Sequence, residues 1–167
     1  MTASACKSPT VSFFDRLRAV FPGRAADDPL VRGTRALDRG RLDDAQAAFR
    51  EALGLAATAG QAATARNKLA VLAVHRGDRE GAVEQLVLAL EADARSAAAI
   101  TTIGNLLLED GDVGEAIAHY EAALRIDDRY APAYHNFGVA LHRSGRRAEA
   151  VRMLRQATRL ETRMVRR

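Results

Sequence analysis

Four histidines are the side chains in this sequence best suited to acid–base or metal chemistry near neutral pH. They are His75, His119, His135 and His142. Seven residues separate His135 from His142, so a helix would place both on one face but about 10 Å apart along its axis. That distance is too long for one metal ion, and no further side chain reaches ligand spacing. We therefore expect surface or groove histidines and no metal site.

Other catalytic patterns are missing from the sequence. It contains no Gly-rich phosphate loop and no His-Glu-x-x-His motif, and its one cysteine, Cys6, cannot form an intrachain disulfide. Asp43-Asp44 and Asp127-Asp128 are carboxylate pairs, which we interpret as caps at helix starts. The sequence thus predicts a protein that is not an enzyme and has no cofactor.

The composition favours closely packed helices. Apolar residues make up 48% of the chain, but aromatic residues only 5%, whereas strands are rich in aromatic and β-branched side chains. No stretch approaches the roughly 18 apolar residues of a membrane-spanning helix, and no apolar run precedes Cys6 as a secretion signal would require. We therefore expect a cytoplasmic protein.

A period of 34 residues runs through most of the chain. Gly77, Gly111 and Gly145 are spaced by 34 residues, with alanines five and twelve positions after each, and a weaker copy is centred on Gly40. A glycine just past a helix end adopts the left-handed conformation at little cost. The small residues let two helices approach closely. The pattern predicts a series of helical hairpins.

Polar and large residues between these glycines have expected roles as well. Asp112 is expected to cap the next helix, with Glu115 reaching back to complete a capping box. Tyr120, Leu107 and Leu141 are expected to fill the space between successive hairpins.

This phase and these residue types resemble the tetratricopeptide repeat, a 34-residue helix–turn–helix unit. The resemblance covers residues 63–162 well and 26–59 loosely. It implies an all-α fold, a right-handed α-solenoid of three clear repeats plus one degenerate N-terminal repeat. The sequence ahead of the repeats predicts a short amphipathic helix as well. We expect helices near residues 12–21, 28–38, 42–58, 62–76, 79–92, 97–110, 113–126, 131–144 and 147–164.

Three parts follow from this assignment. An N-terminal tail, 1–25, contains the helix 12–21, the repeat domain spans 26–162, and a basic tail covers 163–167. The repeat units are expected at 26–59, 63–96, 97–130 and 131–164.

The resemblance also implies a binding surface, because in this family the inner helix of each repeat lines a concave face. The matching positions mix hydrogen-bonding and aliphatic side chains, which suits an extended or helical peptide of another protein. The predicted groove residues are Asn67, Val71, Val74, His75, Thr101, Asn105, Leu108, Glu109, His135, Val139, His142 and Arg143.

A second apolar surface is expected in the segment SPTVSFFDRLRAVFPG, residues 8–23, where Ser12 can cap a helix. Three interpretations stay open: an end cap on the first repeat, a helix in a membrane interface, or docking into another copy or a partner, which would make a homo-oligomer. The apolar face consists of Phe13, Phe14, Leu17, Val20 and Phe21.

The C-terminal part is strongly basic. Residues 143–167 carry a net charge of +7, while the whole chain is at +4. This charge is interpreted either as a solvated face or as a contact surface for an acidic partner. Nucleic acid is disfavoured because no aromatic residues for base stacking are interleaved. The basic stripe consists of Arg152, Arg155, Arg159 and Arg163.

Together these patterns predict a bacterial scaffold or assembly factor that binds a segment of a partner protein. One alternative is a chaperone like the small-repeat proteins that hold secretion translocators in type III systems, which also carry an N-terminal helix before three repeats. The other is an assembly factor at the periphery of the inner membrane, anchored by the helix at 12–21.

Overall fold

The structure, a computed structural model, describes residues 28–165, with side chains through Arg163. The helix expected at 12–21, with its five-residue apolar face, lies outside this range. Within it the chain is all-helical. The helices are α2 (Pro29–Asp38), α3 (Leu42–Gly54), α4 (Ala59–His75), α5 (Arg79–Ala92), α6 (Ala97–Asp110), α7 (Val113–Ile126), α8 (Ala131–Arg143) and α9 (Arg147–Val165).

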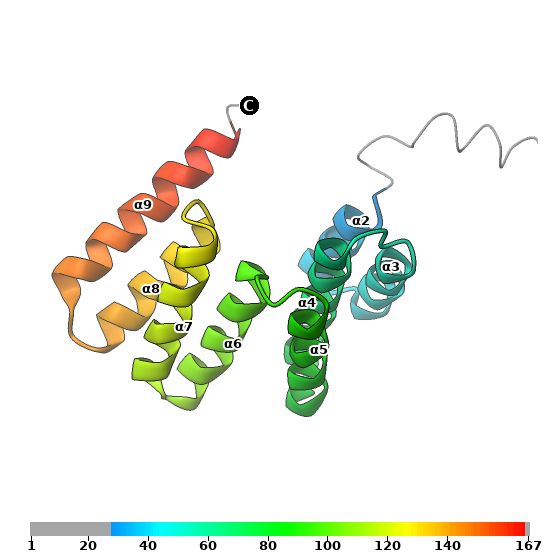
Figure 1. The fold of residues 1–167 in the computed structure, drawn as a ribbon, viewed down its shortest axis with the longest axis horizontal. Helices are drawn as coiled ribbons and strands as arrows, with labels where there is room; N and C mark the ends of the chain where they lie inside the picture. Colours follow the sequence, from blue (N-terminus) through cyan, green and yellow to red (C-terminus); the bar gives the residue numbers. More distant parts are fainter. Residues whose placement is uncertain (1–27, 166–167) are drawn as a thin grey trace, which may run out of the picture.

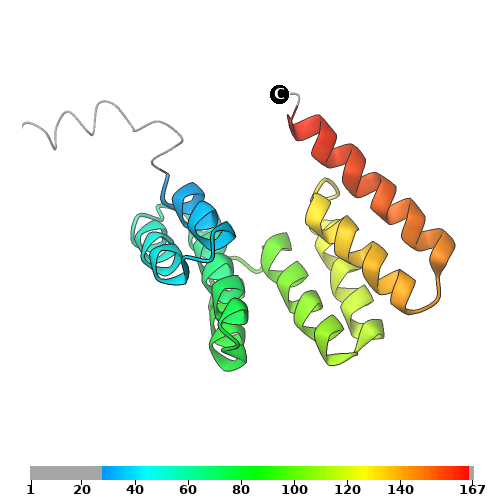
Figure 2. The same cartoon turned by 180° about the vertical axis from the view of Figure 1, so that it is seen from behind.

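These helices form consecutive hairpins, α2/α3, α4/α5, α6/α7 and α8/α9, which stand side by side in sequence order (Figures 1 and 2). The first helix of each hairpin runs close to the first helix of the next, whereas the backbones of the second helices in the described range stay apart from one another. Because neighbouring first helices lie closer together than neighbouring second helices, the array curves, and the first helices form its concave side. We call α2, α4, α6 and α8 the inner helices and α3, α5, α7 and α9 the outer helices. The predicted all-α solenoid is confirmed.

Four glycines close the inner helices in the left-handed conformation that the 34-residue period predicts. Gly40, Gly77, Gly111 and Gly145 have φ values of 69°, 75°, 90° and 83°. A side chain with a Cβ would be strained at each of these positions. The role of these glycines as helix-ending residues is confirmed.

The junction between the first two hairpins differs from the prediction. The helix expected at 42–58 ends at Gly54, and the helix expected at 62–76 begins at Ala59. Thr58 and Gln61 form a capping box there, with each side chain bonded to the backbone N–H of the other residue. This reciprocal cap satisfies two backbone donors and thereby starts α4 earlier than the period implies.

The predicted acidic caps are wrong in three places. Asp112 precedes α7, but its side chain makes no cap hydrogen bond. Its ψ of 61° lies outside the extended region that directs a capping side chain at the helix. Asp127 follows α7 and accepts a hydrogen bond from the Arg129 N–H within the loop. Asp43 and Asp44 occupy the first turn of α3, where their negative charges interact favourably with the positive end of the helix dipole.

Close approach within three of the four described hairpins, α2/α3, α6/α7 and α8/α9, depends on glycine at one inner-helix position. A Cβ built on Gly104 would lie 2.7 Å from the Tyr120 ring, and one on Gly33 would lie 2.4 Å from the Phe49 ring. Real side chains do not tolerate such contacts, so each ring occupies the space that glycine leaves. Tyr120 thus packs inside its own hairpin as well as against the next, where its ring centroid lies 6.5 Å from that of Phe137.

The core is a chain of apolar clusters that runs from α2 to α9. Its largest fully buried side chains are those of Tyr120, Phe49, Leu72, Leu86 and Leu141. Leu141 and the half-buried Leu107 belong to the same cluster as Tyr120, which spans α6 to α9. Their expected place between hairpins is therefore confirmed. Each hairpin contributes side chains to its neighbour's core, so the array holds the inner helices in fixed positions.

Candidate functional site

The twelve predicted groove residues lie on three successive inner helices. Asn67, Val71, Val74 and His75 belong to α4, the next four to α6 and the last four to α8. Corresponding residues are 34 apart, so the array repeats the same helix face three times. The stacked hairpins therefore align these residues along the concave side. Each set of equivalent residues, such as Val71, Asn105 and Val139, forms one column that crosses α4, α6 and α8.

Three of the twelve predicted groove residues are too buried to contact a partner. Asn67, Thr101 and Leu108 are only 6%, 3% and 7% exposed, so their side chains lie inside the array and offer little surface to a partner. Thr101 also donates its hydroxyl to the Ala97 carbonyl oxygen of its own helix at 2.7 Å. The accessible groove residues are Val71, Val74, His75, Asn105, Glu109, His135, Val139, His142 and Arg143.

A hydrogen-bond network, which we call the Asn105 cluster, joins three helices at the centre of this surface. The Oδ1 atom of Asn105 accepts from the Tyr120 hydroxyl at 2.9 Å and from Nδ2 of Asn136 at 2.8 Å. Asn105 lies on α6, Tyr120 on α7 and Asn136 on α8. Two donors on one oxygen fix the orientation of the Asn105 amide, which leaves its Nδ2 group to donate elsewhere.

The environment of Tyr120 keeps its hydroxyl protonated. Burial, opposed in part by the charge of Arg143 and assisted by that of Glu109, raises the pKa of Tyr120 to about 12. The hydroxyl is therefore a donor throughout the neutral range. Arg143 in turn donates to the Leu108 carbonyl oxygen at 2.9 Å. The structure thus brings Asn105, Glu109 and Arg143 together around one rigid polar centre.

Sequence reasoning missed the contributions of Asn136 and the Tyr120 hydroxyl to this centre. A signal for them was present in the repeat alignment. Asn105 stands where the neighbouring repeats have Val71 and Val139, and Tyr120 stands where they have Leu86 and Leu154. Both polar departures fall in one hairpin. A buried tyrosine hydroxyl requires a partner, and the asparagine supplies it.

The histidines do not form a chemical centre. His75, His135 and His142 are exposed, and His119 is half-buried, with its Nδ1 atom 3.0 Å from the Glu115 carbonyl oxygen. Between residues 28 and 163, no three His, Cys, Asp or Glu side chains gather as metal ligands would. None of the helices described is both long and apolar enough to cross a membrane.

The basic stripe lies on α9, away from the inner helices. Arg152, Arg155, Arg159 and Arg163 are all exposed. Arg152 approaches the Glu149 carboxylate at 3.9 Å. The stripe is therefore a separate surface and not part of the groove.

Two tetratricopeptide repeat models match the chain, one over residues 30–99 and the other over residues 95–161. Together they cover every hairpin of the described structure. Proteins built from this repeat generally act as non-catalytic modules that bind other proteins. No curated protein matches the chain.

Solved structures share the architecture. TTC0263, a thermophilic TPR protein of Thermus thermophilus, is 24% identical with a TM-score of 0.65, over 83% of this chain and 75% of that one. MamA is 23% identical with a TM-score of 0.57, over 92% and 88%. Pseudomonas aeruginosa pilF is 25% identical with a TM-score of 0.62 over 81% of this chain, which spans only 61% of pilF. The repeat models and the hairpin array agree, and the chain belongs to the tetratricopeptide repeat family.

Proposed function

We propose that the chain is a non-catalytic scaffold or assembly factor that holds a peptide or helix of a partner protein on its concave side. The observation that carries the proposal is the Asn105 cluster. It fixes a polar amide between two aliphatic positions, Val71 and Val139, on the neighbouring inner helices. A rigid donor flanked by apolar surface suits a peptide that offers both carbonyl oxygens and apolar side chains.

The charges around this centre suit a polar peptide as well. Glu109 and Arg143 are exposed at the ends of α6 and α8. Their opposite signs can orient a bound segment by pairing with a basic group at one point and an acidic group at another. The two alternative functions, a type III-like chaperone and a membrane-associated assembly factor, both depend on residues 12–21. The groove proposal depends only on described residues.

Charge insertion tests the groove. Peptides that bind the full chain are first selected from a random peptide library, and the dissociation constant is then measured by fluorescence anisotropy. We expect Val71→Arg and Asn105→Arg each to weaken binding by at least tenfold, or about 1.4 kcal/mol. Each change adds a charge and a long side chain where the peptide would lie.

Val87→Arg is the matched control. Val87 lies on the outer helix α5 and is 51% exposed, so the same charge is added outside the groove, and binding should be unchanged. Circular dichroism checks that all three variants keep their helices. Unchanged affinity in both groove variants, or an equal loss with Val87→Arg, would show that the concave side is not the binding site.

A further inference from the structure

In the part of the chain that the structure describes, α9 lacks the cover that each other outer helix receives from the next inner helix. At one repeat-equivalent position, Phe49, Leu86 and Tyr120 are at most 2% exposed. Leu154, the corresponding residue of α9, is only half-buried. The next inner helix completes the burial of the first three residues, and no described helix follows α9. Among the described residues, one side of the α8/α9 hairpin is therefore a helix-binding face without a partner helix.

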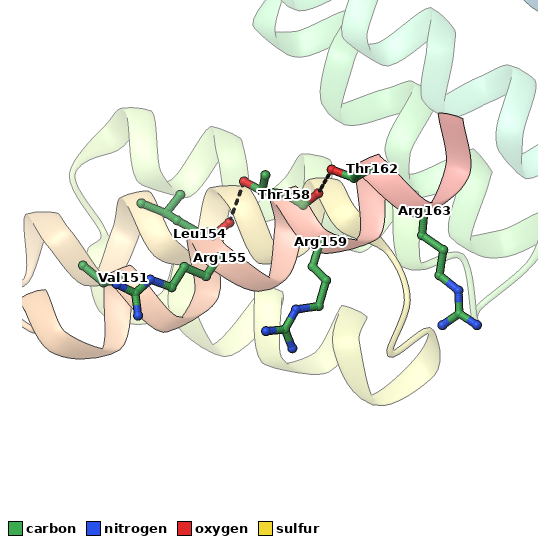
Figure 3. Close-up of a pocket in the computed structure, with 7 residues that line it drawn as sticks. All are labelled: Val151, Leu154, Arg155, Thr158, Arg159, Thr162 and Arg163. Carbon is green, nitrogen blue, oxygen red and sulfur yellow. Dashed lines mark hydrogen bonds between the residues drawn. The ribbon is translucent and has the colours of Figure 1, made fainter. Parts of the chain in front are cut away.

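This face forms an open groove of about 820 Å³ along α9. Its floor consists of Val151, Leu154, Thr158 and Thr162. Arg155, Arg159 and Arg163 project from one edge (Figure 3). The groove is also long, because α9 has 19 residues whereas α3, α5 and α7 have 13 or 14.

The threonines make the floor less polar than its sequence suggests. Thr158 donates its hydroxyl to the Leu154 carbonyl oxygen at 3.1 Å, and Thr162 donates to the Thr158 carbonyl oxygen at 2.8 Å (Figure 3). Both hydroxyls are thus satisfied within α9. A partner that covers them leaves neither hydroxyl donor unpaired, which lowers the cost of burying this floor.

The edge of the groove determines the charge of the partner. Arg155, Arg159 and Arg163 follow one another every four residues, or about every 6 Å along the helix. Among the described side chains, no carboxylate lies within salt-bridge distance of these three, whereas Arg146 and Arg152 both approach Glu149. Three aligned guanidinium groups beside an apolar floor favour a partner with carboxylates at matching spacing.

The repeat itself determines the shape of the partner. On α7, the equivalent face is covered by the helix α8, whose Phe137 and Leu141 pack around Tyr120. A helix is therefore the form that fits between successive outer faces. We propose that the exposed face of α9 binds an acidic amphipathic helix of a partner protein, which lies across the end of the array as an additional inner helix would.

Charge argues against two occupants that this chain could supply, a second copy of α9 and the segment 12–24. A second copy of α9 offers the same lining, which contains arginines but no carboxylate. The segment 12–24 carries Arg16, Arg18 and Arg24 against the single Asp15. Either occupant would bring further positive charge to the arginine edge, whereas an acidic helix neutralises it.

Synthetic helical peptides test this proposal. The first has a leucine and alanine stripe flanked on one side by glutamates four residues apart, and the second replaces these glutamates with lysines. We expect the glutamate peptide to bind the full chain and gain helicity, and the lysine peptide not to bind. In the combined variant Arg155→Glu, Arg159→Glu and Arg163→Glu, the affinity for the glutamate peptide should fall by about tenfold or more. The same variant should bind the lysine peptide, which the unaltered chain does not bind.

Two controls make the result specific. The combined variant Arg35→Glu, Arg39→Glu and Arg50→Glu changes the net charge equally at exposed sites of the α2/α3 hairpin, which makes no contact with α9 in the described structure. Binding of both peptides to this variant should be as in the unaltered chain. Val71→Arg, in the concave groove, should also have no effect, which separates this face from the proposed function. Binding of neither peptide, no exchange of preference on charge reversal, or an equal loss in the control triple would overturn the proposal. Binding of anionic vesicles or duplex DNA in place of the glutamate peptide would overturn it as well.

Discussion

Replacing Tyr120 with alanine is expected to lower the free energy of unfolding by about 3–5 kcal/mol, the usual cost of removing a buried aromatic ring. Tyr120 is 0% exposed and belongs to the cluster that joins α6 to α9. Its ring fills the space above Gly104 and contacts Phe137 of the next hairpin. The loss should appear in thermal unfolding as a decrease in Tm of roughly 10 °C.

Tyr120→Phe separates the ring from its hydroxyl. This variant keeps the packing but loses the hydrogen bond to Asn105, so we expect a decrease of only about 1 kcal/mol. Both values can be measured by urea denaturation followed by circular dichroism. A Tyr120→Ala variant that unfolds no earlier than Tyr120→Phe would contradict the packing role of the ring.

Gly104→Ala should be destabilising although alanine favours helix. In a helix, alanine is preferred to glycine by about 1 kcal/mol, but here the new Cβ would lie 2.7 Å from the Tyr120 ring. Overpacking of this kind costs about 1–3 kcal/mol, so the steric effect should exceed the gain in helix propensity. Gly114→Ala is the matched control. Nothing lies within 4 Å of the Cβ position of Gly114, and alanine there should stabilise the chain.

A second change should reverse the sign of the effect. The α4/α5 hairpin already has the pair Ala70 and Leu86 where α6/α7 has Gly104 and Tyr120. In a Tyr120→Leu background, Gly104→Ala should therefore be neutral or stabilising, with a coupling of about 1–3 kcal/mol in a double-mutant cycle. Additive effects of the two substitutions would show that the glycine does not make room for the ring.

The repeat pattern predicts the fold because the residue type at each of its positions is set by local backbone geometry or packing. Gly77, Gly111 and Gly145, spaced by 34 residues, and Gly40, which lies 37 residues before Gly77, each end an inner helix in the left-handed conformation, so the requirement for glycine is the same in all four hairpins. The junction at residues 55–58 could not be found in this way. Its alanines favour helix by propensity, and the start of α4 depends on a capping box that lies outside the period.

The candidate groove was only partly predictable for a different reason. The 34-residue period assigns residues to the inner helices. It does not show which of these residues become buried when one hairpin stacks on the next. Asn67, Thr101 and Leu108 share columns with exposed residues such as His135 and His142, yet all three are buried. Their burial depends on contacts between hairpins, which a pattern within one repeat does not contain.

The most direct test of the proposed function is nuclear magnetic resonance of the labelled full chain with a library-selected peptide added. Backbone amide and side-chain shifts report which residues contact the peptide, without any substitution. The proposed function predicts the largest changes at Val71, Asn105 and Val139, with smaller changes along the outer helices. Largest changes on α3, α5 or α9, with the inner helices unaffected, would contradict it.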